Sequence, residues 1–164
     1  MQNFEELFIT LQAATGKKVR KEASKLTDEY EHMLTIYEGT CEDSVEFLLS
    51  VFRDKDLCDK PGVDMFAMMA GNELFLMSDA QKKSIYSTLR NMYQNYNNLD
   101  FCWVVGDLIA RNYERKEAMD FFSSEFPKST HNGKEGIALG LDIIARQEGR
   151  SAEVNKMIDR ILKT

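Results

Sequence analysis

Hydrophobic residues recur every three or four positions along most of the chain, as they do on one buried face of an α-helix. The longest series runs from Val19 to Tyr37, and Gly39 follows it as a stop signal. Only two prolines and nine glycines interrupt the chain. The pattern predicts about nine helices and no strand, with approximate ranges 2–14, 19–37, 40–52, 63–76, 79–96, 101–109, 118–122, 132–144 and 154–161.

Polar residues three positions apart mark several expected helix starts. The first side chain of such a pair can accept a hydrogen bond from a backbone N–H of the first turn, and the second can reach back. The pairs are Thr40 with Asp43, Ser78 with Gln81, and Asn132 with Glu135. The clearest loop signal is the segment LCDKPGVD, residues 57–64, because Pro61 lacks a backbone donor and Gly62 tolerates turn geometry.

One short sequence occurs twice. DLIARN, residues 107–112, returns 35 positions later as DIIARQ, residues 142–147, and ELFLMS, residues 73–78, is a poorer upstream copy. A second helical series follows each copy, so the repeated unit is a helical hairpin of about 35 residues, a period typical of stacked hairpins. We therefore expect an all-α fold of stacked antiparallel helical hairpins, a short α-solenoid.

The small residues of this region carry a family resemblance. Gly106 and Ala118, and again Gly140 and Ala152, are twelve positions apart, and an apolar residue precedes each glycine. This spacing resembles that of tetratricopeptide repeats, and HEAT-like hairpins fit it equally well, over residues 73–162. The resemblance implies a stack of helical hairpins.

Length and composition are those of a globular domain. The 164 residues are 43% hydrophobic and 29% charged, which suffices for one domain without a metal or disulfide. Within residues 1–164 we expect acidic N-terminal helices over 1–60 and hairpin repeats over 63–164. The three cysteines are odd in number and form no C-x-x-C pair, so a disulfide framework is not indicated and a reducing cytoplasm is the expected location.

The N-terminal sequence does not indicate secretion or membrane insertion. MQNFEELFITLQAATG carries two glutamates where a signal peptide has basic residues. Apolar runs stay well below the roughly 18 residues of a spanning helix.

Charge is distributed unevenly. The net charge of −6 argues against a large phosphate-binding surface. Residues 28–64 hold eleven acids and three bases, whereas KKVRKEASK, residues 17–25, holds five bases and one acid. Such a concentration of carboxylates can steer a basic partner protein. The candidate partner-binding residues are Glu38, Glu42, Asp43, Glu46, Asp54, Asp56 and Asp59.

Candidate catalytic groups have simpler structural interpretations. Asp107 with Arg111, and Asp142 with Arg146, have the i, i+4 spacing of surface ion pairs. His32 has no metal-ligand partner at helical spacing, and phosphate-binding, nucleophile-elbow and zinc-protease motifs do not occur. We therefore predict no enzyme activity, no cofactor and no metal site.

Thiols and soft apolar residues leave some alternatives open. Cys102, between two aromatic residues, fits a core position, and Cys58 fits an exposed one. The methionine-rich stretch MFAMMAGNELFLM, residues 65–77, fits core packing better than an adaptable peptide groove. Tyr93 and Tyr96, which lie near Arg90, fit a ligand-stacking cluster and a helix end equally well.

Together these features predict a cytoplasmic, non-catalytic protein-binding module. In size, acidity and lack of catalytic motifs the chain is similar in kind to small acidic bacterial immunity proteins, which implies a basic toxin as the partner. One alternative is a scaffold that holds a peptide between helices 63–76 and 79–96. A nucleic-acid-binding helical repeat or an enzyme is a third possibility, for which KKVRK and four arginines, Arg111, Arg115, Arg146 and Arg150, are the available groups.

Overall fold

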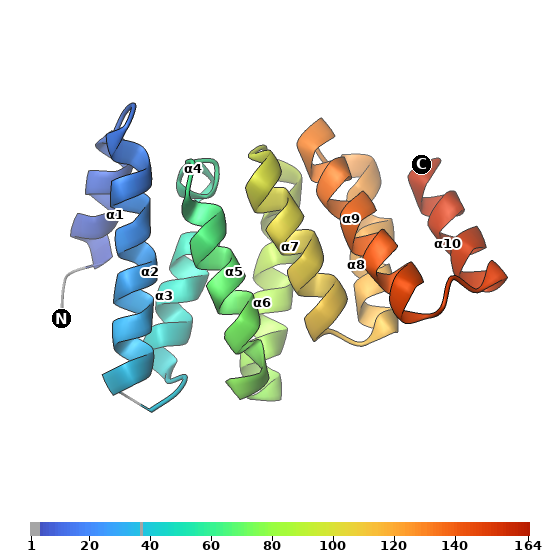
Figure 1. Cartoon of the computed structure of the whole chain (residues 1–164), viewed down its shortest axis with the longest axis horizontal. Coiled ribbons are helices and arrows are strands. Elements are labelled where there is room, and N and C mark those ends of the chain that lie inside the picture. Colours follow the sequence, from blue (N-terminus) through green and yellow to red (C-terminus); the bar gives the residue numbers. More distant parts are fainter. Residues whose placement is uncertain (1–3, 37) are drawn as a thin grey trace. The chain divides into compact units, whose positions relative to one another are not determined.

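The chain is all-α, as the periodicity predicts. The computed structural model describes residues 4–36 and 38–164, and in these it contains ten α-helices, three short 3-10 helices and no strand (Figure 1). They form two compact units, Met1–Met92 (the N unit) and Tyr93–Thr164 (the C unit). The boundary between them falls inside the expected helix 79–96, not at residues 60–63, where the charge composition changes.

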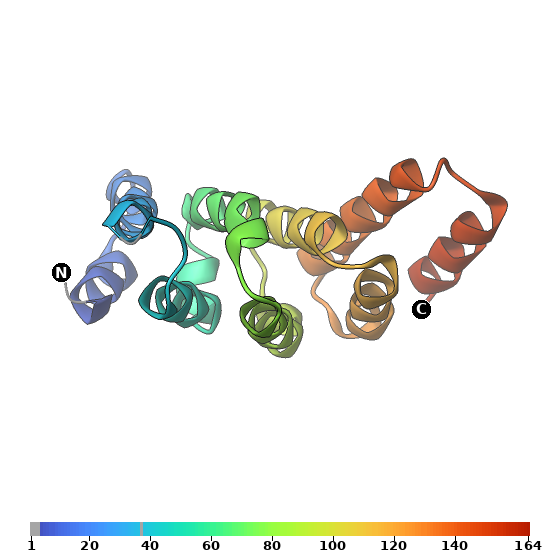
Figure 2. The same ribbon diagram turned by 90° about the horizontal axis from the view of Figure 1, so that it is seen from below.

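The N unit contains six α-helices in its described part. They are α1 (Phe4–Ala13), α2 (Lys18–Ile36), α3 (Glu42–Phe52), α4 (Lys55–Cys58), α5 (Val63–Glu73) and α6 (Asp79–Met92), with a 3-10 helix, η1 (Leu74–Leu76), after α5. Helix α2 packs against α1, α3 and α5, and α3 packs against α6. In Figure 2, α2 and α5 share one layer of this unit, and α3 and α6 share the other.

Aromatic rings form the core of the N unit. The Phe66 ring on α5 meets those of Tyr30, Phe47 and Phe52, with centroids 5.6, 5.7 and 6.3 Å away in edge-to-face arrangements. All four side chains are fully buried. Because these rings come from α2, α3 and α5, burial of one cluster holds three helices together.

The short helix α4 was not expected from the sequence, which indicates a loop there. Asp54 caps it by accepting a hydrogen bond from the Leu57 N–H at 3.1 Å, and it also accepts one from the Gln12 side chain at 2.8 Å. Lys60 donates to the carbonyl oxygens of Gln12 and Ala14 at 3.2 and 3.3 Å. The end of α1 is thereby tied to the segment around α4, since a lysine amine satisfies carbonyls left open at a helix C-terminus.

Of the three helix starts expected from polar pairs, one is confirmed and two are wrong. The Ser78–Gln81 capping box is confirmed, with hydrogen bonds of 2.9 and 3.2 Å in the two directions. The start at Thr40 is wrong, because Cys41 caps α3 in a capping box with Ser44, while Thr40 donates to the Leu76 carbonyl. The start at Asn132 is also wrong. There Thr130 is the cap and accepts from the Gly133 N–H at 3.0 Å.

The C unit contains four α-helices. These are α7 (Leu99–Asn112), α8 (Arg115–Glu125), α9 (His131–Gln147) and α10 (Ala152–Leu162), and two 3-10 helices, η2 (Tyr93–Asn95) and η3 (Phe126–Lys128), complete the unit. Helices α7 and α9 run parallel and make the most extensive helix contact of the unit (Figure 1). A Cβ atom at Gly106 would overlap the Gly136 carbonyl oxygen, and one at Gly136 would overlap the carbonyl oxygen of Cys102.

The repeated hexapeptide occupies the same place in two helices. Residues 107–112 end α7, residues 142–147 end α9, and in both the three central residues are buried and the arginine is exposed. Residues 73–78 differ, because there the chain leaves α5 into η1 and two of the corresponding apolar residues are exposed. The poorer sequence match therefore has a different local structure.

Candidate functional site

The predicted acidic residues lie near the two ends of α3. Glu38 is exposed in the α2–α3 connection, with a positive φ of 52°. Glu42 and Asp43 form the first turn of α3, and Glu46 follows one turn later. Asp54, Asp56 and Asp59 lie beyond the other end. Helix α3 is about 15 Å long at about 1.5 Å per residue, so the seven residues form two groups instead of one continuous surface.

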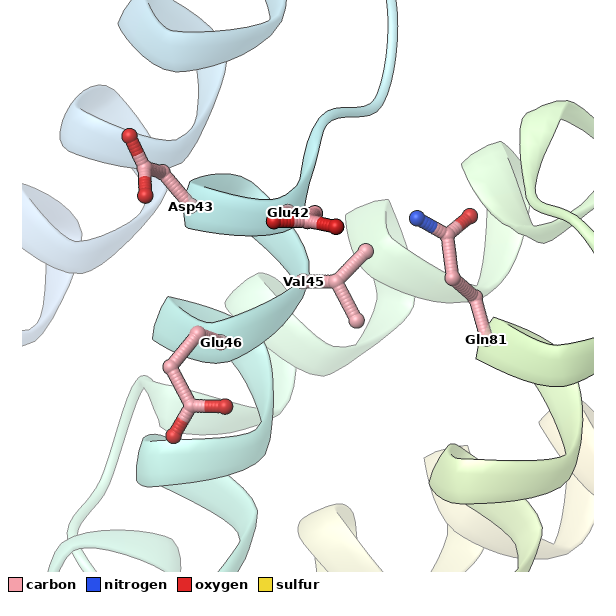
Figure 3. A pocket seen from close by; sticks show the side chains of 5 residues that line it. All are labelled: Glu42, Asp43, Val45, Glu46 and Gln81. Atoms are coloured by element: carbon pink, nitrogen blue, oxygen red, sulfur yellow. The ribbon is translucent and has the colours of Figure 1, made fainter.

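The first group borders an open hollow of about 430 Å³ on the N unit, which we call the acidic hollow. Glu42, Asp43, Val45, Glu46 and Gln81 line it. Figure 3 shows Glu42 and Val45 on the side of α3 that faces Gln81, whereas Asp43 and Glu46 point away from Gln81. The carboxylates spread along the rim and do not converge on one point, an arrangement that suits a broad cationic surface better than a single metal ion.

Local electrostatics differ among these carboxylates. Glu42 and Asp43 are exposed in the first turn of α3, where the helix dipole favours negative charge. Glu46 forms an ion pair with Arg53, with 3.2 Å between its Oε1 and the arginine Nη1. Glu42 and Asp43 therefore carry most of the negative charge available to a partner at this end.

The second group is more involved in the fold. Asp56 and Asp59 line a separate hollow with Gln12 and Lys60. Asp54, as the cap of α4 and the acceptor for Gln12, already uses its carboxylate within the N unit. This second group therefore borders a hollow, and through Asp54 and Lys60 the same segment also holds the end of α1.

Two segments of the N unit carry only negative formal charge. Residues 26–52 and residues 61–81 contain no lysine or arginine. Their acids are Asp28, Glu29, Glu31, Glu38, Glu42, Asp43, Glu46, Asp64, Glu73 and Asp79. The segments are separated by residues 53–60 and meet in the fold, because α2 packs on α5 and α3 packs on α6. Of the three bases in region 28–64, Arg53 pairs with Glu46 beside the acidic hollow, and Lys55 and Lys60 lie beyond the other end of α3.

Tyr30 in the N unit and Tyr93 in the C unit are buried tyrosines with a raised phenol pKa. Among the described residues the buried Tyr30 hydroxyl has no hydrogen-bond partner. Burial, with smaller contributions from Glu73 and Cys41, raises the pKa of this phenol well above its ordinary value. The Tyr93 hydroxyl donates to the Gly133 carbonyl oxygen at 2.7 Å, and burial, with a contribution from Cys102, raises its pKa as well. Both phenols remain neutral at physiological pH.

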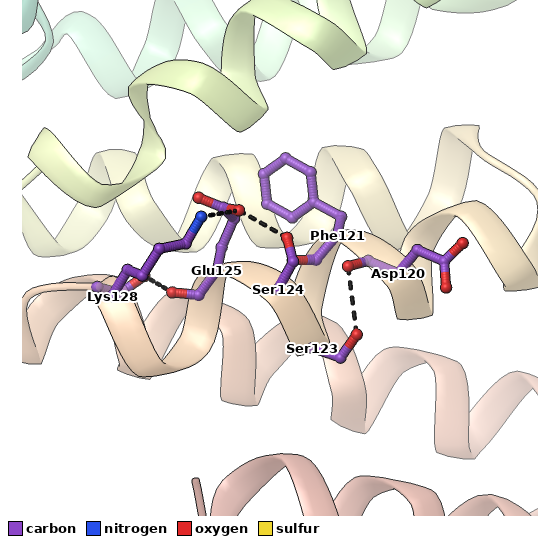
Figure 4. A network of polar contacts seen from close by, with 7 residues as sticks. Asp120, Phe121, Ser123, Ser124, Glu125 and Lys128 are labelled. Carbon is purple, nitrogen blue, oxygen red and sulfur yellow. Dashed lines mark hydrogen bonds and ion pairs between the residues drawn. The ribbon is translucent and has the colours of Figure 1, made fainter.

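One carboxylate of the C unit is almost fully buried. Glu125 accepts hydrogen bonds at one oxygen from the Ser124 hydroxyl at 2.6 Å and the Lys128 amine at 2.8 Å (Figure 4). Its backbone carbonyl accepts from the Ser129 hydroxyl at 2.7 Å. These bonds connect the end of α8 to η3 and the following turn, which gives Glu125 a structural role.

The histidines are exposed, and two of the three cysteines are buried. His32 is exposed on α2, and His131 is the exposed first residue of α9. Cys102 is buried as predicted, but the prediction that Cys58 is exposed is wrong. Its thiol is buried and donates to the Val51 carbonyl at 3.2 Å, since α4 turns it toward α3. Within residues 4–36 and 38–164, no three His, Cys, Asp or Glu side chains group as a metal site.

Two methionines are exposed where core packing was expected, whereas both tyrosines of the possible ligand-stacking cluster are buried. The core interpretation of the methionines is wrong for Met65 and Met68, which are 53% and 42% exposed on α5. Tyr93 and Tyr96 are fully buried, with ring centroids 6.1 Å apart, so they belong to the helix end and its core. Among the aromatic residues of the acidic region 28–64, Tyr30, Phe47 and Phe52 belong to the core, and Tyr37 lies outside the described residues.

Comparison with known proteins gives no family assignment. Among the helices that the structure describes, none combines the length and the apolar character needed to cross a bilayer. No family model matches the chain, and neither a curated protein nor a solved structure matches it.

Proposed function

We propose that the protein is a non-catalytic protein-binding module whose partner presents a basic surface to the acidic hollow. An immunity-type inhibitor that neutralises a basic toxin in the cytoplasm is the specific form that we favour. The observation that carries the proposal is the position of Glu42 and Asp43. Both residues are exposed at the start of α3, beside the acidic hollow, and the segment 26–52 around them contains no lysine or arginine.

We expect the acidic hollow to affect the rate of association more than the affinity. Exposed carboxylates on a rim contribute little to stability, but like charges held together raise the local potential and accelerate association with a cationic protein. Val45, nearly buried in the floor of the hollow, offers limited apolar area to a partner there. We therefore expect the hollow to set the association rate and the partner's orientation.

The test is a triple charge reversal, Glu42→Lys, Asp43→Lys and Glu46→Lys. The partner is first recovered from the native host with the protein as bait, and association is then followed by stopped-flow fluorescence or surface plasmon resonance. We expect the association rate to fall by about tenfold or more at low salt, with a smaller difference at high salt, because counterions screen the interaction.

A matched control has the same change in charge at a distance. Glu135, Glu153 and Asp159 are exposed on α9 and α10 of the C unit, and their reversal to lysine alters the net charge equally. If both triple variants slow association alike, net charge and not the acidic hollow governs binding. An unchanged rate in the first variant would remove the hollow from the interface.

A further inference from the structure

Four exposed apolar side chains lie along the outer side of α5 and η1. Met65, Met68, Phe75 and Leu76, on α5 and η1, are 53%, 42%, 75% and 46% exposed. The buried residues of the same helix, among them Phe66, Ala67 and Ala70, lie on its opposite side. Single exposed apolar residues are ordinary on protein surfaces, but a group along one helix face is typical of an interaction site.

The geometry of this face follows from helical spacing. Positions 65, 68, 72 and 75 are separated by three, four and three residues, so they lie along one side of α5 and η1. The exposed Asn72 separates the two methionines from Phe75 and Leu76, and we call these four apolar side chains the stripe. The stripe is about 16 Å long at about 1.5 Å per residue. Its side chains are two methionines, which adapt to different partner shapes, and a phenylalanine, which has a large apolar area.

Acidic residues border most of the stripe, and Arg20 lies beside Gly62 at its N-terminal end. Asp64 and Glu73, near the ends of α5, are the only charged residues between Pro61 and Ser78. The Thr40 hydroxyl donates to the Leu76 carbonyl oxygen at 3.1 Å, so the connection that carries Glu38 lies beside η1. Glu38 is exposed, and so is Ile36, the last residue of α2, at 58%. Apolar side chains with an acidic border complement an apolar surface with a cationic border.

We propose that this α5 face binds an amphipathic helix of the partner that carries leucine-like residues on one side and lysines or arginines beside them. The inference rests on the proposed protein-binding function and adds a second contact surface with a defined partner chemistry. A helix is the occupant that fits best, because a helix face with residues at three- and four-residue spacing packs against the ridges of another helix.

A second copy of this chain is a poorer occupant. Two α5 faces brought together would place Asp64, Glu73 and Glu38 of one copy near the same residues of the other, and like charges at an interface oppose association. The stripe therefore requires a partner of opposite charge to its border.

The experiment uses a fluorescently labelled model peptide and the full-length protein. The peptide is about 18 residues of leucine and lysine, with leucines at i, i+3, i+4 and i+7. A scrambled peptide of the same composition and a leucine–glutamate peptide of the same pattern are the comparison ligands. We expect fluorescence anisotropy to show saturable binding of the leucine–lysine helix, with binding of the two comparison peptides at least about tenfold weaker.

Two exposed positions of the stripe are then changed, Met68→Gln and Phe75→Gln. The double variant should bind the leucine–lysine peptide at least about tenfold more weakly, since two apolar contacts are lost. Ile9→Gln and Leu162→Gln, which alter exposed apolar residues on α1 and α10, are the matched control and should retain binding. Circular dichroism of each variant verifies that the helices are intact.

The other outcomes overturn the inference. These are no saturable binding by the unchanged protein, equal binding of the leucine–glutamate peptide, or full binding by the Met68→Gln and Phe75→Gln variant. Concentration-dependent dimerisation that this variant abolishes, seen by analytical ultracentrifugation, would assign the face to a second copy. Failure here is distinguishable from failure of the proposed function, because the triple reversal at Glu42, Asp43 and Glu46 tests a different surface with the whole partner.

Discussion

The backbone of Gly106 on α7 lies directly against the backbone of Gly136 on α9. A Cβ atom at position 106 would overlap the Gly136 carbonyl oxygen, and it would lie 3.5 Å from the Gly140 nitrogen. Main chain meets main chain at this crossing, so neither helix can withdraw from a new side chain by a simple rotamer change. The two parallel helices of the C unit are held at a separation that only glycine permits.

Alanine at Gly106 or Gly136 is therefore expected to destabilise the C unit by up to about 2 kcal/mol. Overpacking of a close contact typically costs about 1–3 kcal/mol. The better helix propensity of alanine, about 1 kcal/mol, offsets only part of this cost. Trp103, the single tryptophan, lies on α7, so its fluorescence during urea unfolding reports on this unit.

Gly133→Ala is the control for this effect. A Cβ at Gly133 would meet the Cβ of Ser129 at 3.0 Å, a side-chain contact in the first turn of α9. We expect a distinctly smaller loss of stability than at Gly106. Equal losses at the two positions would show that backbone proximity of α7 and α9 is not the cause.

Alanine at Asp107 or Asp142 should change the free energy of unfolding by well under 1 kcal/mol. Each aspartate pairs with the arginine four residues later, at 2.7 and 2.8 Å, and both pairs are substantially exposed. Solvent and salt screen such pairs. Urea unfolding monitored at Trp103 measures the change, and a loss of several kcal/mol would indicate that the carboxylate has a further role.

Tyr30→Phe and Tyr93→Phe are expected to differ although both remove a buried hydroxyl. At position 30 the hydroxyl has no partner in the part of the chain that the structure describes, so its removal should leave stability unchanged or raise it by up to about 1 kcal/mol. At position 93 the change removes the bond to the Gly133 carbonyl and should cost about 1 kcal/mol. Thermal and urea unfolding of the two variants provide the comparison, and similar losses in both would contradict it.

The same tyrosines predict a loss of stability at alkaline pH. Burial raises both phenol pKa values above the ordinary value of 10.0, so above pH 10 the folded chain retains protons that the unfolded chain releases. The unfolded state is then favoured increasingly, and the free energy of unfolding should fall as pH rises beyond 10, whereas the contribution is fully present below that pH.

The alkaline effect is measured as a difference between proteins. Lysines also titrate in this range, so urea midpoints between pH 9 and 11 are compared for the unchanged chain and the Tyr30→Phe, Tyr93→Phe double variant. The double variant should show the shallower decline. Parallel curves would mean that other groups dominate.

Much of the secondary structure was accessible from the sequence because the helices are amphipathic. Three- and four-residue spacing of apolar positions located nine of the ten α-helices in the described residues. Helix α4 was missed, since four residues are too few to show a period, and its formation depends on the Asp54 cap and the tertiary bond from Gln12. The starts of α3 and α9 were misplaced because Cys41 is an uncommon cap and because Thr130 and Asn132 are both good capping residues.

The surfaces were harder to predict than the helices. Glu42, Asp43 and Glu46 were grouped correctly because they are neighbours within one helical turn, while the structural uses of Asp54 and Lys60 depend on contacts with α1. Burial of Cys58 and exposure of Met65 and Met68 could not be read from periodicity alone. A helix as apolar as α5 does not reveal which side faces the core until its neighbours are known.

The cluster around Phe66 also governs how the protein can be divided into fragments. A peptide ending at residue 60 would retain Tyr30, Phe47 and Phe52 but lack the ring that all three contact. Such a fragment would leave three large aromatic side chains without their shared partner and would be prone to aggregate. Proteolytic or recombinant dissection should therefore keep residues 1–92 together, and a short peptide copied from the acidic segment is a poor substitute for the folded N unit.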